Sequence, residues 1–122
     1  MSIARALYDT CSFESDYGPI INHFGEVLLR GDVGDYQGSS FIVYDDYSLL
    51  EFGWGSCSGC DALQSCDTFE EIDELIDSLE GDILRFSSKE IFIKYINNRD
   101  WEGEWAYGEE GFEEFLEKAK KL

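Results

Sequence analysis

Three strand-forming runs with very short connections constrain the fold of this chain more than any other feature. The runs cover residues 26–33, 39–45 and 48–54, and only residues 34–38 and 46–47 separate them. Parallel strands would need a crossover of about a dozen residues or more, whereas antiparallel strands can be joined by tight turns. The sequence therefore predicts a small antiparallel β-meander over about residues 26–54, with the first strand broken near Gly31.

Capping signals mark two helices in the second half of the chain. Thr68 is followed three residues later by Glu71, and Ser87 is followed in the same way by Glu90. This spacing is typical of a capping box, in which the two side chains satisfy backbone N–H groups of the first helical turn. Because apolar residues recur at helical spacing after each box, we predict helices that begin at Thr68 and Ser87, the first of which ends at Gly81.

The remaining segments complete an α+β pattern. A short helix is predicted near residues 3–8, and a second opens at Gly18-Pro19. Aromatic residues at odd positions favour a short strand or ribbon over residues 100–107. We expect one globular domain over residues 1–122, in which helices from the C-terminal half cover one face of the sheet. The last helix, over residues 109–122, should bury Phe112, Phe115, Leu116 and Ala119.

The charge balance excludes several classes of function. The chain carries 27 acidic and 9 basic residues, for a formal net charge of -18. Phosphate contacts require a surface rich in lysine and arginine, so direct binding to nucleic acid is not expected. No apolar run approaches the roughly 18 residues of a membrane span, and no signal peptide opens the sequence. We therefore expect a cytoplasmic protein that binds neither nucleic acid nor a membrane.

The acidic side chains gather in two clusters that predict a basic protein partner. In the helix after Thr68 the outward positions have no basic neighbour within four residues, so the helix forgoes about 0.2–0.5 kcal/mol per ion pair. Self-repulsion opposes folding, and a partner would compensate for it, although a solvated surface without a partner stays open. The predicted contact residues are Glu70, Glu71, Asp73, Glu74 and Asp77, then Glu109, Glu110, Glu113 and Glu114, with Trp101 and Trp105 as aromatic anchors.

A cysteine-containing turn follows the third strand-forming run. Cys57 and Cys60 have the C-x-x-C spacing of a zinc knuckle, and Cys66 lies six residues beyond the second of them. A closed structural zinc site needs four ligands, so Cys11 or His23 would have to supply the fourth. Acidic neighbours oppose the lowered thiol pKa that redox chemistry requires. Two alternatives stay open: a zinc-stabilised structural or adaptor domain, and a tight turn with buried thiols and no cofactor.

The sequence contains no assembled catalytic motif. His23 is the only histidine, it stands among apolar residues, and no G-x-S-x-G elbow accompanies it. Carboxylate pairs are too numerous for an acid and a base to be singled out. No glycine-rich segment matches a phosphate-binding loop. We therefore expect that the protein is not an enzyme.

The stretch around the cysteines carries the most specific motif of the chain. Tyr36-x-Gly38 precedes a strand-forming run, and the later run Gly-x-Gly-Ser-Cys-Ser-Gly-Cys-Asp-x-Leu extends from Gly53 to Leu63. Asp61 within it is expected to begin a short helical turn. These residues resemble a group of small acidic proteins of bacteriophages and their hosts. The resemblance implies a context and assigns no functional residue: an early effector that blocks a host enzyme acting on nucleic acid.

Charge and context together give the functional hypothesis. We predict an acidic protein-binding inhibitor, a phage anti-defence or host-takeover protein that blocks a basic nucleic-acid-binding groove of a host protein. The alternative is the zinc-stabilised structural or adaptor domain built on Cys57, Cys60 and Cys66.

Overall fold

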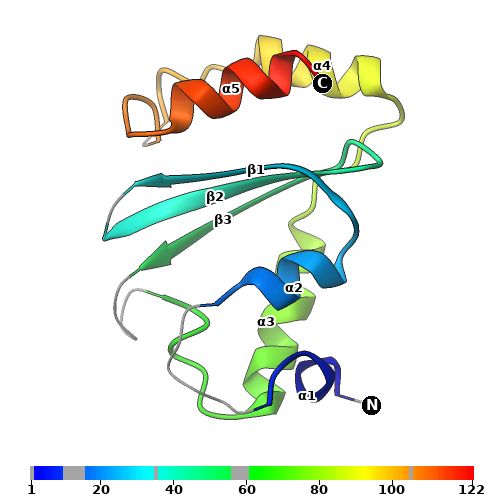
Figure 1. The fold of residues 1–122 in the computed structure, drawn as a ribbon, viewed down its shortest axis with the longest axis vertical. Coiled ribbons are helices and arrows are strands. Elements are labelled where there is room, and N and C mark those ends of the chain that lie inside the picture. Colours follow the sequence, from blue (N-terminus) through cyan, green and yellow to red (C-terminus); the bar gives the residue numbers. More distant parts are fainter. Residues whose placement is uncertain (1, 10–15, 35, 56–60, 105) are drawn as a thin grey trace.

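A three-stranded antiparallel sheet lies at the centre of the computed structural model, which describes residues 2–9, 16–34, 36–55, 61–104 and 106–122 (Figure 1). The pairing of its central strand with both neighbours is antiparallel throughout. The predicted α+β fold with a small β-meander is therefore confirmed. The strands, in spatial order, are β1 (Val27–Gly34), β2 (Gln37–Tyr44) and β3 (Leu49–Gly55).

Gly31 does not break β1, contrary to the prediction. It pairs with Phe41 inside the β1–β2 ladder, and the irregularity of the ladder lies earlier, between Val27 and Leu29. A Cβ atom on Gly31 would stand 2.6 Å from Cδ1 of Phe115, closer than real side chains approach. The glycine therefore provides the space in which the last helix approaches the sheet.

Helices cover both faces of the sheet (Figure 1). Helices α2 and α3 lie on one face, with α1 packed against α3, and helices α4 and α5 lie on the other. The prediction that helices cover only one face is therefore wrong. The helices of the described residues are α1 (Ile3–Leu7), α2 (Gly18–His23), α3 (Phe69–Gly81), α4 (Lys89–Asn98) and α5 (Phe112–Lys120).

The central strand explains why both faces must be covered. Phe41, Ile42, Val43 and Tyr44 are all buried, although successive side chains of a strand point to opposite faces. Ile42 and Tyr44 belong to the core beneath α2 and α3, whereas Phe41 and Val43 belong to the core beneath α4 and α5. A run without a polar position is typical of a strand that is buried on both sides.

Of the two predicted helix caps, one is confirmed and the other lies one residue away from its predicted position. Thr68 caps α3 as predicted, since its Oγ1 accepts the N–H of Glu71 at 3.1 Å. Helix α4 begins one residue later than predicted, because the hydroxyl of Ser88 and not that of Ser87 accepts the N–H of Ile91, at 3.3 Å.

Residues 102–104 and 106–107 form turns, and the strand or ribbon predicted over residues 100–107 is wrong for the described part of this segment. The N–H of Glu104 donates to the carbonyl of Trp101 at 3.0 Å, and the N–H of Tyr107 donates to the carbonyl of Glu104 at 3.1 Å. The backbone is thus satisfied locally instead of in a ladder. The helix that follows buries the residues predicted for it, Phe112, Phe115, Leu116 and Ala119.

Candidate protein-binding surface

Helix α3 buries one side and presents carboxylates on the other. Its buried side chains are Ile72, Ile76 and Leu79. Exposed acidic residues recur every third position along the rest of the helix, and residues three apart are surface neighbours, with Cβ atoms about 5–6 Å apart. Within the described residues, none of these carboxylates lies within ion-pair distance of a cationic side chain. We call this set, Glu71, Glu74, Asp77 and Glu80, the unpaired acidic face.

Glu70, a predicted partner contact, is paired within the molecule. Nη2 of Arg5 in α1 lies 3.2 Å from Oε1 of Glu70, and the guanidinium also lies 4.7 Å from the centre of the Phe69 ring. The backbone N–H of Glu70 itself and the guanidinium of Arg5 hold the pKa of this carboxyl below its ordinary value. Because both side chains are exposed, the pair contributes little to stability, but it does occupy the carboxylate.

Asp73 holds α1 in place and is therefore a structural residue. Its Oδ1 accepts the backbone N–H of Ala4 at 2.7 Å, and its Oδ2 accepts the hydroxyl of Ser2 at 2.7 Å. These hydrogen bonds, that of Ala4 above all, lower the pKa of Asp73. Both carboxylate oxygens are engaged in the fold, so Asp73 does not belong to the surface that faces a partner.

The second predicted acidic cluster lies on the other side of the sheet. Glu109, Glu110, Glu113 and Glu114 are exposed at the start of α5, which covers the face opposite α3 (Figure 1). Glu113 and Glu114 stand in the first turn, where carboxylates stabilise the positive end of the helix dipole. Glu114 also accepts Nζ of Lys118 at 2.9 Å. The two clusters therefore do not form one contact surface, and α3 supplies the stronger candidate.

The predicted aromatic anchor Trp101 is part of the core. Its side chain is buried against Phe41 and Phe112, and its indole N–H donates to the carbonyl of Ile96 at 2.8 Å. A hydrogen-bonded, buried indole is not available to a partner, so this prediction is wrong. Trp105 lies outside the described residues.

Most residues of the predicted zinc site lie outside the described residues: Cys57, Cys60 and the alternative fourth ligand Cys11. Cys66 is buried, and its thiol donates at 3.3 Å to the carbonyl four residues earlier. His23 is exposed at the end of α2. Among the residues that the structure describes, no three potential metal ligands gather in one place. The zinc hypothesis stays a prediction.

Asp61 is a buried carboxylate whose role the sequence showed only in part. It accepts the hydroxyl of Tyr17 at 3.1 Å and the N–H groups of Gly55, Leu63 and Gln64 at 2.9, 3.0 and 3.0 Å. The N–H of Ser65 donates to the carbonyl of Asp61 at 3.1 Å, so the expected helical turn at Asp61 is confirmed. The carboxylate of Asp61 joins this turn to β3 and α2. Burial, together with the charge of Asp61, raises the pKa of Tyr17, so the phenol stays protonated and donates.

Arg99 joins the end of α4 to β3. Its guanidinium pairs with the carboxylates of Glu51 and Glu104, donates to the hydroxyl of Tyr95 at 2.8 Å, and lies 4.0 Å from the centre of the Trp101 ring. Burial alone would lower the pKa of Arg99, but the hydrogen bonds to the two carboxylates hold it above its ordinary value. Sequence reasoning missed this cluster, because Glu51 lies 48 residues from Arg99.

Two hollows adjoin this cluster and share Tyr95 and Arg99 in their walls. The larger has a volume of about 460 Å³, and its other lining residues are Phe86, Ile91, Lys94 and Asn98. The smaller has a volume of about 300 Å³, and its other lining residues are Leu49, Glu51, Asp82 and Leu84. We call the two hollows together the α4 trough.

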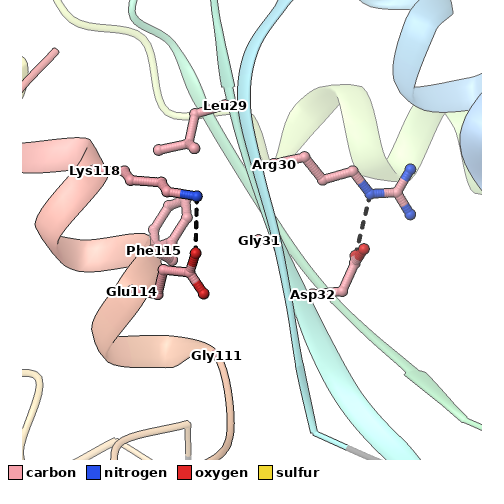
Figure 2. A pocket seen from close by; sticks show the side chains of 8 residues that line it. All are labelled: Leu29, Arg30, Gly31, Asp32, Gly111, Glu114, Phe115 and Lys118. Atoms are coloured by element: carbon pink, nitrogen blue, oxygen red, sulfur yellow. Dashed lines mark hydrogen bonds and ion pairs between the residues drawn. The ribbon is translucent and has the colours of Figure 1, made fainter.

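A third hollow, of about 230 Å³, lies between β1 and α5 (Figure 2). Its charged side chains are paired within their own elements: Lys118 with Glu114 at 2.9 Å, and Arg30 with Asp32 at 3.2 Å. Figure 2 shows that Arg30 and Asp32 point away from α5. The hollow therefore presents no uncompensated charge to a ligand.

Comparison with known proteins does not assign this chain to a family, so its class is described by its fold and its surface. No protein-family model, no curated protein and no solved structure matches the chain. The class is an α+β protein with a small, doubly covered antiparallel sheet and an acidic surface. In the described part of the chain, each helix is too short or too polar to cross a bilayer.

Proposed function

We propose that the protein is an acidic protein-binding inhibitor whose unpaired acidic face occupies a basic nucleic-acid-binding groove of a partner protein. In the context implied by the motif between Gly53 and Leu63, that partner is a host protein. One observation carries the proposal: four exposed carboxylates follow one another along α3, and no cation within the described residues compensates for them.

The arrangement of charges on α3 lowers the stability of the free protein. An exposed helix normally gains about 0.2–0.5 kcal/mol from each pair of opposite charges three or four residues apart. The unpaired acidic face has like charges at that spacing instead, in a chain whose net charge of -18 already opposes compaction. A partner rich in lysine and arginine removes both penalties when it binds.

The geometry suits a groove that ordinarily holds phosphates. The carboxylates form a row on a rigid helix whose other side is fixed in the core by Ile72 and Ile76. A row of negative charges can replace a run of phosphates against lysine and arginine side chains. Such a contact should form quickly at low ionic strength and weaken as salt is added.

The proposal is tested by capture and displacement. The immobilised protein is exposed to a host lysate at low salt, retained proteins are eluted with a salt gradient, and the eluted proteins are identified by mass spectrometry. The expected result is one basic protein in stoichiometric amount, which duplex DNA or RNA displaces when added in excess. Retention that excess nucleic acid leaves unchanged would contradict occupation of a nucleic-acid-binding groove.

A further inference from the structure

Each hollow of the α4 trough is bordered by one exposed aliphatic side chain. Ile91 on the wall of the larger hollow is 46% exposed, and Leu84 on the wall of the smaller hollow is 41% exposed. Exposed apolar side chains beside a hollow mark interaction sites more often than isolated ones do. A volume of about 460 Å³ is ample for one large apolar side chain.

The charges of the smaller hollow are predominantly negative. Arg99 lines the hollow, but its positive charge is neutralised by ion pairs with Glu51 and Glu104. Asp82 is exposed and, among the described residues, has no cationic partner. The remaining cation, Lys94, lines the larger hollow only. This end of the trough therefore favours a cationic group.

The α4 trough approaches the end of α3 at one edge of the sheet, because Leu49 and Glu51 of the edge strand β3 line the smaller hollow together with Asp82. Asp82 is the C-cap of α3 and stands two residues beyond Glu80, the last carboxylate of that face. From there the chain runs past the sheet into α4 (Figure 1). A basic segment that follows α3 thus arrives first at Asp82 and then at the hollow beside Ile91.

From this arrangement we infer that the α4 trough binds a segment of the same basic partner, with a lysine or arginine against Asp82 and a large apolar side chain in the hollow beside Ile91. This inference rests on the proposed function and adds an apolar anchor to it. The acidic face supplies attraction to many basic proteins, whereas a filled apolar hollow selects among them.

Short synthetic peptides test the inference without knowledge of the partner. One peptide alternates lysine with leucine, a second alternates lysine with serine, and a third alternates glutamate with leucine. Binding is followed through the backbone amide signals of the full ¹⁵N-labelled chain. The lysine–leucine peptide should shift signals of both α3 and residues 86–95, the lysine–serine peptide only those of α3, and the glutamate–leucine peptide neither set.

Two variants localise the contact. Ile91→Ser removes an apolar wall of the trough, and Leu28→Ser is the matched control, because Leu28 is 45% exposed on β1. Ile91→Ser should weaken binding of the lysine–leucine peptide about tenfold, the factor that corresponds to ~1.4 kcal/mol, to the level of the lysine–serine peptide. Leu28→Ser should leave it unchanged. Both replacements are at exposed positions, and urea denaturation verifies that the variants are folded.

The outcomes separate the two proposals. The trough is not a site for a basic segment if Ile91→Ser binds the lysine–leucine peptide as tightly as the wild type does. The same conclusion follows if the glutamate–leucine peptide shifts the signals of residues 86–95. Neither result affects the proposed contact of α3. If neither lysine-containing peptide shifts the signals of α3, the proposed function fails instead, whatever happens at the trough.

Discussion

The ring of Phe115 in α5 lies directly against Gly31 of β1. A Cβ atom on Gly31 would stand 2.6 Å from Cδ1 and 2.9 Å from Cβ of Phe115. Gly31 is held in place by its pairing with β2, and Phe115 is held in place on the buried side of α5. This contact therefore sets how closely α5 approaches the sheet.

Replacement of Gly31 should separate α5 from the sheet. Gly31→Ala is expected to lower the free energy of unfolding by about 1–3 kcal/mol through overpacking, as measured by urea denaturation. Gly53→Ala on β3 is the control, since its Cβ would meet nothing closer than 3.7 Å. Equal stabilities of the two variants would show that the contact at Gly31 is not tight.

Trp101 should matter to stability because it is buried. Trp101→Ala is expected to lower the free energy of unfolding by about 3–5 kcal/mol. Tyr107→Ala is the comparison, because Tyr107 is 46% exposed and should contribute much less. A small effect of Trp101→Ala in urea denaturation would restore the interpretation of this side chain as a surface anchor.

The attachment of α1 through Asp73 should depend on pH. The hydrogen bonds from Ala4 and Ser2 hold the folded pKa of Asp73 below the ordinary value of 3.8. The unfolded chain therefore takes up a proton at this site before the folded chain does as the pH falls. The contribution of Asp73 to the free energy of unfolding is fully present at pH values above the ordinary pKa of an aspartate. It is lost as the pH falls through the lowered pKa of the folded state.

A comparison with Asp73→Asn isolates this contribution from the many other carboxylates. Wild type should be more stable than the variant at pH 6, and the difference should shrink as the pH falls below about 3.8. Urea denaturation at a series of pH values measures the difference. A difference that stays constant across this range would show that the charge of Asp73 does not contribute.

Removal of carboxylates from the unpaired acidic face should strengthen the fold at low salt. The suitable variant combines Glu74→Gln, Asp77→Asn and Glu80→Gln, and it leaves Glu71 in place because that residue belongs to the capping box with Thr68. Like charges are removed, and Glu80 no longer faces the negative end of the helix dipole, a gain of about 0.3–1 kcal/mol. The melting temperature should rise, and the rise should fade with added salt. A fall would reveal a structural role for these carboxylates.

Local patterns in the sequence predicted most of the fold. The short connections required an antiparallel meander, and the apolar spacing of Phe112, Phe115 and Leu116 identified the buried side of α5. The covering of both faces was also readable, in the unbroken apolar run from Phe41 to Tyr44, but was missed. Ser87 and Ser88 are adjacent possible caps, and the local pattern indicated the first whereas the structure has the second.

Contacts between distant parts of the chain were beyond the sequence patterns. Nothing near Asp73 or Glu70 shows that α1 supplies Ser2 and Arg5 to them, across 71 and 65 residues. The same limit applies to the cluster of Arg99. The helical pattern correctly predicted which carboxylates of α3 point outward. It did not show that Glu70 and Asp73 are engaged by residues 2–5, because that contact depends on the tertiary fold.

The contact between the unpaired acidic face and the captured partner is tested by comparing the affinities of two variants of equal charge. One is Glu74→Gln, Asp77→Asn, Glu80→Gln on α3, and the other is Glu109→Gln, Glu110→Gln, Glu113→Gln at α5. Both remove three negative charges, but from opposite sides of the sheet. If the unpaired acidic face forms the contact, only the α3 variant should lose affinity, by at least about tenfold, ~1.4 kcal/mol. Equal losses for both variants, or none for either, would contradict a contact through the unpaired acidic face.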